Sequence, residues 1–412
     1  MISRRRGGLE LLAPAGNYES LQQAILYGAD AVYLGGLQFG MRQASANFSE
    51  VELKTGIELA HQNDVRIYLT CNTLPRQDEL DGLPDFMLAA EAAGVDALIV
   101  TDMGVMALAR KVVPHMELHM STQTGVVNSL AATELHRLGA SRVILARELT
   151  LPEIADMRTK TPKSLIIEAF VHGAMCMSVS GRCVISNYLT GRDANRGACA
   201  QPCRWNYRLV EEKRPGEYFP VGEEAGGSYI LNSKDLCMLQ HIDKLAAAGI
   251  SSFKIEGRAK SPYYVAIATK AYRAALDSYI ADPEHYNPAP WMVEELNKIS
   301  HRSYSTGFYL PDEEPGQCHD NGGYERDYQV AALVIGSADG YIEVLQKNRF
   351  CKGDIVELVG PDGPPVSFAI TSITDADNNC DIEVANRPQQ RLFIPSSGLR
   401  TNPGSYLRQK VE

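Results

Sequence analysis

Gly28-Ala29-Asp30-Ala31-Val32 joins the end of a predicted helix to the start of a predicted strand. The chain repeats this junction at Gly94-Val95-Asp96-Ala97-Leu98, Gly139-Ala140-Ser141-Arg142-Val143 and Gly249-Ile250-Ser251-Ser252-Phe253. In each copy the glycine can take the left-handed conformation that ends a helix, and a strand begins shortly afterwards. Because every α/β fold uses such a junction, the repeat alone does not separate a closed barrel from an open, doubly wound sheet.

The number of predicted strands favours the barrel. Eight short apolar runs alternate with amphipathic helices such as Tyr18–Tyr27, Leu83–Ala93 and Ala132–Leu138. The strands are predicted over Leu9–Ala13, Ala31–Leu34, Arg66–Thr70, Ala97–Thr101, Glu117–Ser121, Arg142–Ala146, Leu165–Phe170 and Ser252–Glu256. Eight strands, each followed by a helix, describe an α/β fold of the TIM-like (β/α)8 type over residues 1–281. Their nearly continuous apolar character is typical of strands covered on both faces.

One connection is much longer than the others. About eighty residues separate Phe170 from the strand at Ser252, and the extra length forms an insertion over residues 172–230 that follows the seventh strand. Loops after barrel strands lie on the carboxyl-terminal face, where active sites form. We therefore expect the insertion to contribute to function.

The pattern changes after the helix that is predicted over Pro262–Tyr279. Residues 282–327 are rich in proline and are expected to form a connecting loop. Residues 328–412 contain short alternating runs without helices, predicted as strands over Val330–Ile335, Ile342–Leu345, Asp354–Leu358, Val366–Ile373, Asp381–Val384 and Arg391–Ile394. Short strands with turn residues between them predict a small closed β-barrel domain, a candidate docking module for the substrate.

Composition and charge exclude several classes of protein. Hydrophobic residues make up 45% of the 412 residues, but no run of about 18 apolar residues exists, so no membrane span is expected. Fifty acidic against forty basic residues give a formal net charge of −10, so contact with nucleic acid requires a local basic patch. The apolar stretch near the N-terminus is interrupted at Glu10 and Pro14, which argues against an export signal. We therefore expect a cytoplasmic protein with reduced thiols.

Four cysteines of the insertion, Cys176, Cys183, Cys199 and Cys203, follow the spacing C-x6-C-x15-C-x3-C. Four thiolates can bind zinc or hold an iron–sulfur cluster. The paired C-x2-C knuckles of structural zinc sites are missing, so the spacing favours [4Fe–4S]. The alternative is that these cysteines pack in the core as small hydrophobic residues. Glycine, arginine and serine surround them, which argues against an apolar core. Cys237, expected to open a helix, is either a core residue or a substitute fourth ligand.

A basic patch accompanies the cysteines. Arg182, Arg192, Arg196, Arg204 and Arg208 against Asp193 give this stretch a local charge of +4, and Trp205 and Tyr207 lie among them. Arginines interleaved with aromatic residues suit RNA, which they contact through phosphates and stacked bases. The alternative is a solvated loop whose arginines bind backbone carbonyls.

Polar residues at predicted strand ends form a second group of candidates. They are Asn72, Asp102, Ser121, Gln123, Glu148, Glu168, His172, Lys254, Glu256 and Arg258, with Arg42 and Asn47 in the loop after the second strand. Such groups would build a small-molecule pocket at the barrel mouth. Arg42, Arg182 and Arg258 are candidates for binding a carboxylated substrate. Lys254 and Glu256 share a face of their strand, so an internal ion pair is the alternative there.

Glu168-x-Phe170-x2-Gly173-Ala174-Met175-Cys176-x6-Cys183-x2-Ser186 resembles the signature of the peptidase U32 family. The stretches Leu12–Asn17, Gly28–Gly35 and Lys254–Arg258 look like other blocks of that family, over roughly residues 8–310. The family name implies a protease of collagenase type. Better-understood branches are oxygen-independent hydroxylation proteins with a [4Fe–4S] cluster on four cysteines. By position, Cys176, Cys183 and Cys199 match cluster ligands, with Cys203 ahead of Cys237 as the fourth.

The resemblance is strongest to the branch that converts wobble uridine of tRNA to 5-hydroxyuridine, in which prephenate is implicated. Other branches act on ribosomal RNA or, as paired subunits, on a ubiquinone precursor. We therefore expect a tRNA-hydroxylating enzyme that works with an electron or hydroxyl donor system. Candidate catalytic residues are Glu168, His172, Glu256 and Arg258, and candidate substrate-binding residues are Arg42, Asn47, Arg182, Arg192, Arg196, Arg204 and Lys254.

Two other hypotheses stay open. A Cys–His peptidase would use Cys176 with His172, but this leaves the other three cysteines unexplained, and neither G-x-S-x-G nor H-E-x-x-H occurs. A non-catalytic scaffold would use the cluster only to order a loop for a partner protein.

Overall fold

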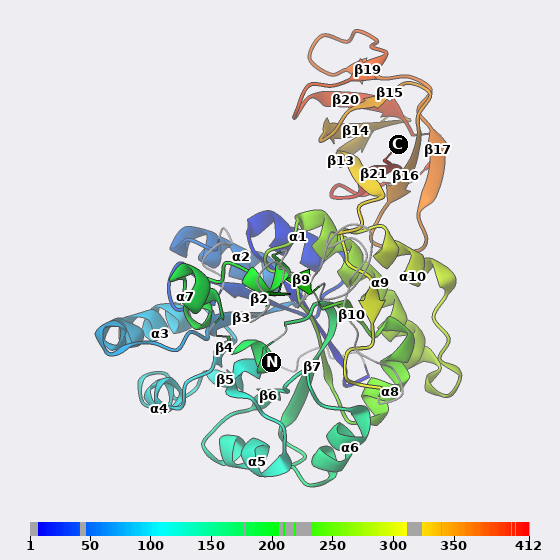
Figure 1. The fold of residues 1–412 in the computed structure, drawn as a ribbon. Coiled ribbons are helices and arrows are strands. Elements are labelled where there is room, and N and C mark those ends of the chain that lie inside the picture. The colour runs from blue at the N-terminus through cyan, green and yellow to red at the C-terminus, as the bar shows by residue number, and fades with distance from the viewer. Residues whose placement is uncertain are drawn as a thin grey trace.

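The chain folds into a barrel surrounded by helices, with a smaller β domain beside it (Figure 1). The computed structural model describes residues 7–41, 47–176, 178–183, 185–205, 209–210, 218–219, 233–310, 324–338, 340–396, 398–399 and 401–411. Among the helices in these ranges, none combines the length and the apolar character that a membrane crossing needs.

Eight parallel strands form the barrel, in agreement with the prediction. They are β1 (Glu10–Pro14), β2 (Ala31–Gly35), β3 (Arg66–Cys71), β4 (Ala97–Val100), β5 (Glu117–Met120), β6 (Arg142–Ile144), β7 (Ile166–Ala174) and β11 (Ser252–Ile255). Each strand pairs with its neighbour, and β11 pairs with both β1 and β7, which closes the ring. This closure confirms the TIM-like barrel and excludes the open sheet.

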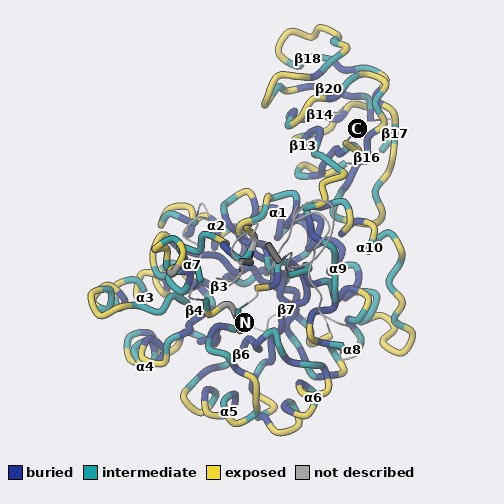
Figure 2. Tube along the Cα trace, in the orientation of Figure 1, coloured by how far each residue is buried: buried dark blue, intermediate teal, exposed yellow. Residues whose placement is uncertain are grey.

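Helices cover the outside of the ring (Figure 1). They are α1 (Tyr18–Leu26), α2 (Glu50–Gln62), α3 (Leu83–Ala92), α4 (Met103–Val112), α5 (Ser129–Arg137), α6 (Leu151–Thr159), α8 (Ile242–Ala247) and α9 (Pro262–Ala281). The four junction glycines, Gly28, Gly94, Gly139 and Gly249, all have φ between 87° and 109°, as helix-ending glycines should. Buried backbone concentrates in the strands, whereas exposed segments follow the outer helices and loops (Figure 2).

The sheet continues beyond the barrel on one side. Strand β7 runs four residues past its predicted end at Phe170, and its last residues pair antiparallel with β10 (Asp235–Cys237). Strand β12 (Tyr304–Ser305) then pairs with β10. Cys237 therefore lies in a strand and does not open a helix as predicted, because pairing with β7 fixes the backbone there in an extended form.

The insertion consists of short elements. They are η3 (Val179–Gly181), α7 (Ile185–Thr190), η4 (Ala194–Arg196), η5 (Pro202–Arg204), β8 (Leu209–Val210) and β9 (Tyr218–Phe219).

The connecting segment contains a helix that was not predicted from the sequence. Helix α10 (Pro290–Asn297) begins at a proline, packs against α9 and buries Met292 and Leu296. Proline is common in the first turn of a helix, where no hydrogen bond from its nitrogen is needed. The sequence predicts a connecting loop here, whereas Pro290 marks the start of α10.

The C-terminal domain consists of short β-strands, as predicted, and its main sheet is antiparallel. Its strands are β13 (Tyr328–Ala338), β14 (Tyr341–Gln346), β15 (Phe350–Cys351), β16 (Ile355–Val359), β17 (Val366–Ala369), β18 (Thr374–Asp375), β19 (Val384–Ala385), β20 (Arg391–Pro395) and β21 (Tyr406–Lys410). Seven of them form one sheet in the order β17-β16-β21-β13-β14-β20-β18. A closed barrel, as predicted for this domain, requires pairing between the two ends of this order. Within the described part of the domain, no pairing joins β17 to β18. Strands β15, β18 and β21 lie outside the strands predicted from the sequence.

Arg408 also links the two domains. Its guanidinium is fully buried and binds the carboxylates of Glu295 on α10 and Glu357 on β16. The Tyr27 hydroxyl at the end of α1 donates to the Val359 carbonyl, 3.0 Å away. The β domain is therefore anchored to the barrel by buried polar contacts.

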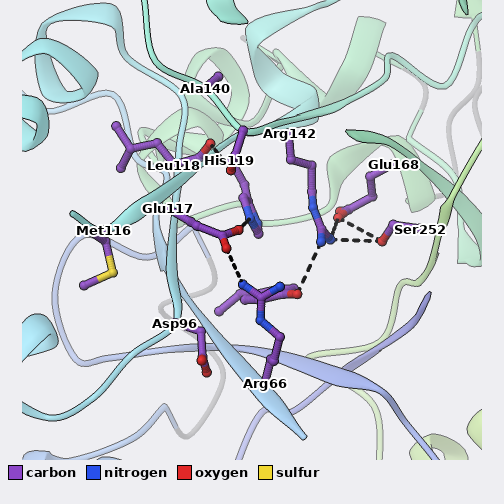
Figure 3. Close-up of polar contacts among 12 residues, drawn as sticks. Arg66, Asp96, Met116, Glu117, Leu118, His119, Ala140, Arg142, Glu168 and Ser252 are labelled. Carbon is purple, nitrogen blue, oxygen red and sulfur yellow. Dashed lines mark hydrogen bonds and ion pairs between the residues drawn. The ribbon is translucent and has the colours of Figure 1, made fainter. Parts of the chain in front are cut away.

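A buried ionic network lies inside the barrel, and Figure 3 shows the part of it around Arg142, Glu168 and Ser252. Nη1 of Arg142 lies 2.5 Å from a Glu10 oxygen, 2.6 Å from a Glu168 oxygen and 3.0 Å from the Ser252 hydroxyl. The other Glu168 oxygen accepts from Lys254 Nζ at 2.9 Å. Two carboxylates and two cations balance one another, and the residues come from β1, β6, β7 and β11.

Replacing Arg142 by alanine is expected to lower the free energy of unfolding by about 3–5 kcal/mol, because Glu10 and Glu168 would lose their shared cation. Arg391→Ala is the matched control, since it breaks an exposed ion pair with Glu343 and should cost less than about 1 kcal/mol. Urea unfolding of both variants measures the difference. Equal losses for the two variants would contradict a structural role for the network.

Candidate functional site at the barrel mouth

A cavity of about 680 Å³ opens at the carboxyl-terminal mouth of the barrel. Its wall includes residues at or just after the ends of β3, β5, β6 and β11, such as Asn72, Gln123, Arg147 and Lys254. This is the face of a (β/α)8 barrel on which substrates bind. The predicted convergence of strand-end residues is therefore present for Asn72, Gln123 and Lys254.

All four cysteines of the predicted motif line this cavity. Cys176, Cys183, Cys199 and Cys203 lie in what we call the cysteine loop, residues 176–205, which follows β7. No three His, Cys, Asp or Glu side chains in the described ranges lie close enough together to hold a single metal ion. Cys237 is not among the lining residues. Its sulfur packs beside the Tyr272 hydroxyl, 3.9 Å away, which separates it from the other four.

Hydrogen bonds tie the cysteine loop to the barrel. The Glu148 carboxylate, just after β6, accepts from the Ser180 amide at 2.6 Å and from the Ser180 hydroxyl at 2.8 Å. Arg182 Nε donates to the Gln123 carbonyl at 2.5 Å. Ser180 has a φ of 47°, a conformation that costs energy for a residue other than glycine. The contacts with Glu148 compensate for this strain and fix the loop over the mouth.

The cavity wall is cationic although the protein as a whole is acidic. Its described lining includes one carboxylate, that of Glu256, and five cations: Arg147, Lys254, Arg258, Lys260 and Arg326. A low-dielectric cleft of one sign attracts ligands of the opposite charge. The arrangement can therefore bind an anionic ligand.

Arg258 is almost fully buried, as is Lys254. Its Nη2 donates to Asn47 Oδ1 at 2.6 Å and its Nη1 to Thr70 Oγ1 at 3.3 Å. A Cβ atom on Gly35 would lie 2.1 Å from Nη2, so the approach of the guanidinium requires glycine there. Asn47 itself has a φ of 53°. Arg258 and Asn47, both in the predicted group of candidates at the barrel mouth, thus lie in contact.

Glu256 and Lys254 do not form the internal ion pair that was the alternative for this strand. The Glu256 carboxylate lies 3.4 Å from Arg147 Nη2, whereas Lys254 binds Glu168. Nζ of Lys254 also lies 4.2 Å from the centre of the Tyr33 ring, a cation–π distance. Both side chains therefore line the cavity with separate partners.

The sequence predicts Glu168 at the barrel mouth, but the structure places it inside the barrel. It is the third residue of β7, fully buried, and bound to Arg142 and Lys254. Burial raises the pKa of its carboxyl group, but Lys254 and Arg142 outweigh burial, and the pKa lies below its usual value. Glu168 stays ionised and contacts the cavity only through Lys254.

His172 is likewise turned away from the cavity. The register between β7 and β11 shifts beyond Phe170, so the alternation of side chains changes there. Phe170 lines the cavity, while the His172 ring packs against Tyr264, Tyr272 and Tyr304. Within the described residues neither ring nitrogen has a hydrogen-bond partner, and burial lowers the pKa of His172 to about 3. The Cys176–His172 pair that a Cys–His peptidase would use is therefore not formed.

The insertion arginines have different surroundings from one another. Arg192 is exposed, whereas Arg196 binds Glu79 in η1 (Gln77–Gly82) at 2.5 Å and Arg182 binds a backbone carbonyl. Two of the predicted basic residues therefore attach the loop. The predicted residues Arg42 and Arg208, and the side chain of Arg204, lie outside the described part of the chain.

Several residues of the site were not predicted from the sequence. Arg147 lies three residues after the end of β6 and next to Glu148, which the strand-end criterion selected. Lys260 and Arg326 line the cavity from segments without a motif. The ionic network in the barrel could have been predicted from charged residues that begin apolar strands, namely Glu10 in β1 and Arg142 in β6.

Fold and site together define a class: a (β/α)8 barrel with a cysteine-bearing loop over a cationic mouth and an antiparallel β domain at its C-terminal end. Family models cover both parts, with Peptidase family U32 matching residues 16–319 and the Peptidase family U32 C-terminal domain matching residues 326–408. The chain belongs to peptidase family U32.

Relatives match this chain over most of their length. It is 39% identical to tRNA hydroxylation protein P1 of Bacillus subtilis, over 92% of this chain and 90% of that protein. It is also 39% identical to an uncharacterized protease of Methanocaldococcus jannaschii, over 93% of this chain and 94% of that one. Identity to tRNA hydroxylation protein P of Escherichia coli is 34%, over 89% of each chain.

His172→Phe is expected to reduce the pH dependence of stability. Because the folded state keeps this ring neutral down to a pKa of about 3, while an unfolded histidine binds a proton near pH 6.5, stability falls as the pH drops below about 6.5. Removing the group should lower the slope of unfolding free energy against pH by about 1.4 kcal/mol per pH unit between pH 4 and 6. Urea titrations measure the slope, and the exposed His285→Phe serves as the control. An unchanged slope for His172→Phe would show that the ring titrates normally.

Proposed function

We propose that this chain hydroxylates tRNA without O2, converting the wobble uridine to 5-hydroxyuridine, with a [4Fe–4S] cluster and prephenate as co-substrate. The observation that carries the proposal is that four cysteines of one loop and five cations line the same cavity. Two relatives that match this chain over most of both lengths are named tRNA hydroxylation proteins. An electron or hydroxyl donor system would act as a partner.

The thiols fit a cluster better than a single metal ion. Cys176, Cys183, Cys199 and Cys203 face one cavity, yet no three potential ligands in the described ranges are close enough for one ion. A four-iron cluster holds its four cysteines further apart than zinc does. Cys203 is the fourth ligand in this proposal, since Cys237 packs elsewhere. The cluster, when bound, would transfer electrons.

The deep cations would bind and orient the co-substrate. Arg258 and Lys254 are each 4% exposed and carry charge at the wall of the cavity. A guanidinium binds carboxylates in two-pronged fashion, and prephenate carries carboxylates. Asn47 and Thr70 would hold the Arg258 guanidinium in place. The entropic cost of ordering this side chain on binding would therefore be small.

Glu256 is the residue of this site suited to moving a proton. Its carboxylate lies at the cavity wall beside Arg147, with which it forms an ion pair. Carboxylates in such positions act as general acids or bases. Glu168 and His172, both proposed from sequence as catalytic, would act at most through the residues they support, because neither lines the cavity in the described structure.

Peptidase activity is the alternative that the family name and the Methanocaldococcus relative favour. A Cys–His peptidase needs an imidazole beside its thiol. No histidine is among the described residues that line the cavity, and His172 packs against tyrosines. The site geometry therefore supports hydroxylation better than proteolysis. Hydroxylation of ribosomal RNA or of a ubiquinone precursor would use the same site, and only the substrate would differ.

Anaerobically purified protein is expected to carry about four irons per chain, as one cluster requires. Cys176→Ser, Cys183→Ser, Cys199→Ser and Cys203→Ser should each lose most of this iron, because each removes a ligand. Cys237→Ser is the matched control and should retain it. Iron analysis and visible absorption provide the measurement. Stoichiometric zinc without iron, or iron loss only in the Cys237 variant, would contradict the assigned ligands.

Arg258→Ala and Glu256→Gln are expected to reduce wobble 5-hydroxyuridine in tRNA by roughly a hundredfold, since each removes a charged contact of about 3 kcal/mol at the site. Mass spectrometry of tRNA nucleosides measures this in cells that lack the native protein and any oxygen-dependent route. Iron content should stay unchanged in both variants, and the surface variant Arg391→Ala serves as the control. Normal 5-hydroxyuridine even in cells without the protein would refute the proposed function.

A further inference from the structure

We propose that Lys260, Tyr324 and Arg326 form a subsite at the rim of the cavity for a phosphodiester group of the RNA substrate. We call these three residues the rim cluster. The inference rests on the proposed function and deepens it, because it assigns the part of the protein that would position the RNA backbone.

The rim cluster joins two segments that are far apart in the sequence. Lys260 lies between β11 and α9, and Nζ of its side chain donates to the Ser300 carbonyl at 3.1 Å. Arg326 lies just before β13, and its Nε donates to the Ser300 hydroxyl at 3.3 Å. All three residues and Ser300 line the cavity. One serine therefore holds the two cations on the same part of the wall.

Tyr324 concentrates positive charge at this point. Nζ of Lys260 lies 4.0 Å from the centre of its ring, and the guanidinium carbons of Arg302 and Arg326 lie 5.5 Å and 5.9 Å from it. Such distances are favourable for cation–π attraction. Arg302 is buried and its charge is matched by Asp235, 2.7 Å away. Of these three cations, Lys260 and Arg326 line the cavity, whereas Arg302 does not.

Two acidic side chains among the described residues near this part of the wall have partners outside the rim cluster. Glu325 is turned toward His301, with 3.8 Å between its oxygen and Nε2. Glu256, the carboxylate of the described cavity wall, lies beside Arg147. An anion at the rim would thus meet two cations of the rim cluster.

Exposure distinguishes the rim cluster from the deep cations. Arg258 and Lys254 are almost fully buried, which suits a small molecule enclosed in the cavity, whereas Arg326 is exposed. A polymer whose backbone stays outside and inserts one nucleotide needs cations at the opening. Phosphate contacts of this kind position the nucleic acid and make binding depend on salt. The observations therefore favour a phosphodiester over a carboxylate of the co-substrate.

The test measures the affinity of the iron-loaded full chain for an unmodified tRNA transcript at several NaCl concentrations. Lys260→Ala and Arg326→Ala should each weaken binding several-fold, and each should reduce the slope of log affinity against log salt by roughly one. Lys260→Arg and Arg326→Lys keep the charge and should keep the slope. Arg137→Ala, an exposed arginine on α5, is the control for general loss of charge.

The outcomes separate the inference from the function on which it rests. If the wild type binds the transcript and both alanine variants retain its affinity and slope, the rim cluster does not bind phosphate, and the proposed function stands. If the alanine variants lose prephenate binding, measured by calorimetry, but keep the salt slope, the site belongs to the co-substrate and the inference is wrong. Loss of affinity in the charge-conserving variants as well would show a structural role and would also overturn it. A wild type that binds no tRNA would defeat the proposed function itself.

Discussion

The buried guanidinium of Arg142 sets the constraint on which the barrel and its mouth depend. Its charge is held between the carboxylates of Glu10 and Glu168, with almost no exposure to solvent. A buried charge without partners costs several kcal/mol, so strands β1, β6, β7 and β11 must close in the register that brings these groups together. Lys254 extends the same network upward to the cavity, because it shares Glu168 with Arg142.

Above this network, the mouth combines rigid support with concentrated charge. Glu148 and Arg182 hold the cysteine loop to the ends of β6 and β5, and Asn47 holds Arg258. Several of these supports involve strained backbone, at Ser180 and Asn47 in particular. Strain of this kind persists where the surrounding structure fixes it, as is common at functional sites. The result is a cationic cavity in a protein whose net charge is −10.

Much of the fold followed from local patterns in the sequence. Glycine at four helix ends and eight apolar runs predicted every barrel strand to within a few residues, because these signals depend on neighbouring residues alone. The C-x6-C-x15-C-x3-C spacing placed four cysteines on one loop after the seventh strand, and a loop in that position can reach only the carboxyl-terminal face. Sequence thus determined the barrel, the cysteine loop and the side of the molecule on which the site lies.

Tertiary structure alone decided where individual side chains point. One shift of register between β7 and β11 directs His172 toward the tyrosines of α9, although simple alternation would place it with Phe170 in the mouth. Glu168 lies inside the barrel because cations from β6 and β11 meet it there. Lys260 and Arg326 come together across the whole connecting segment, and no local pattern links them. Contacts between distant segments depend on how the closed barrel packs, and that information is not contained in any single stretch of sequence.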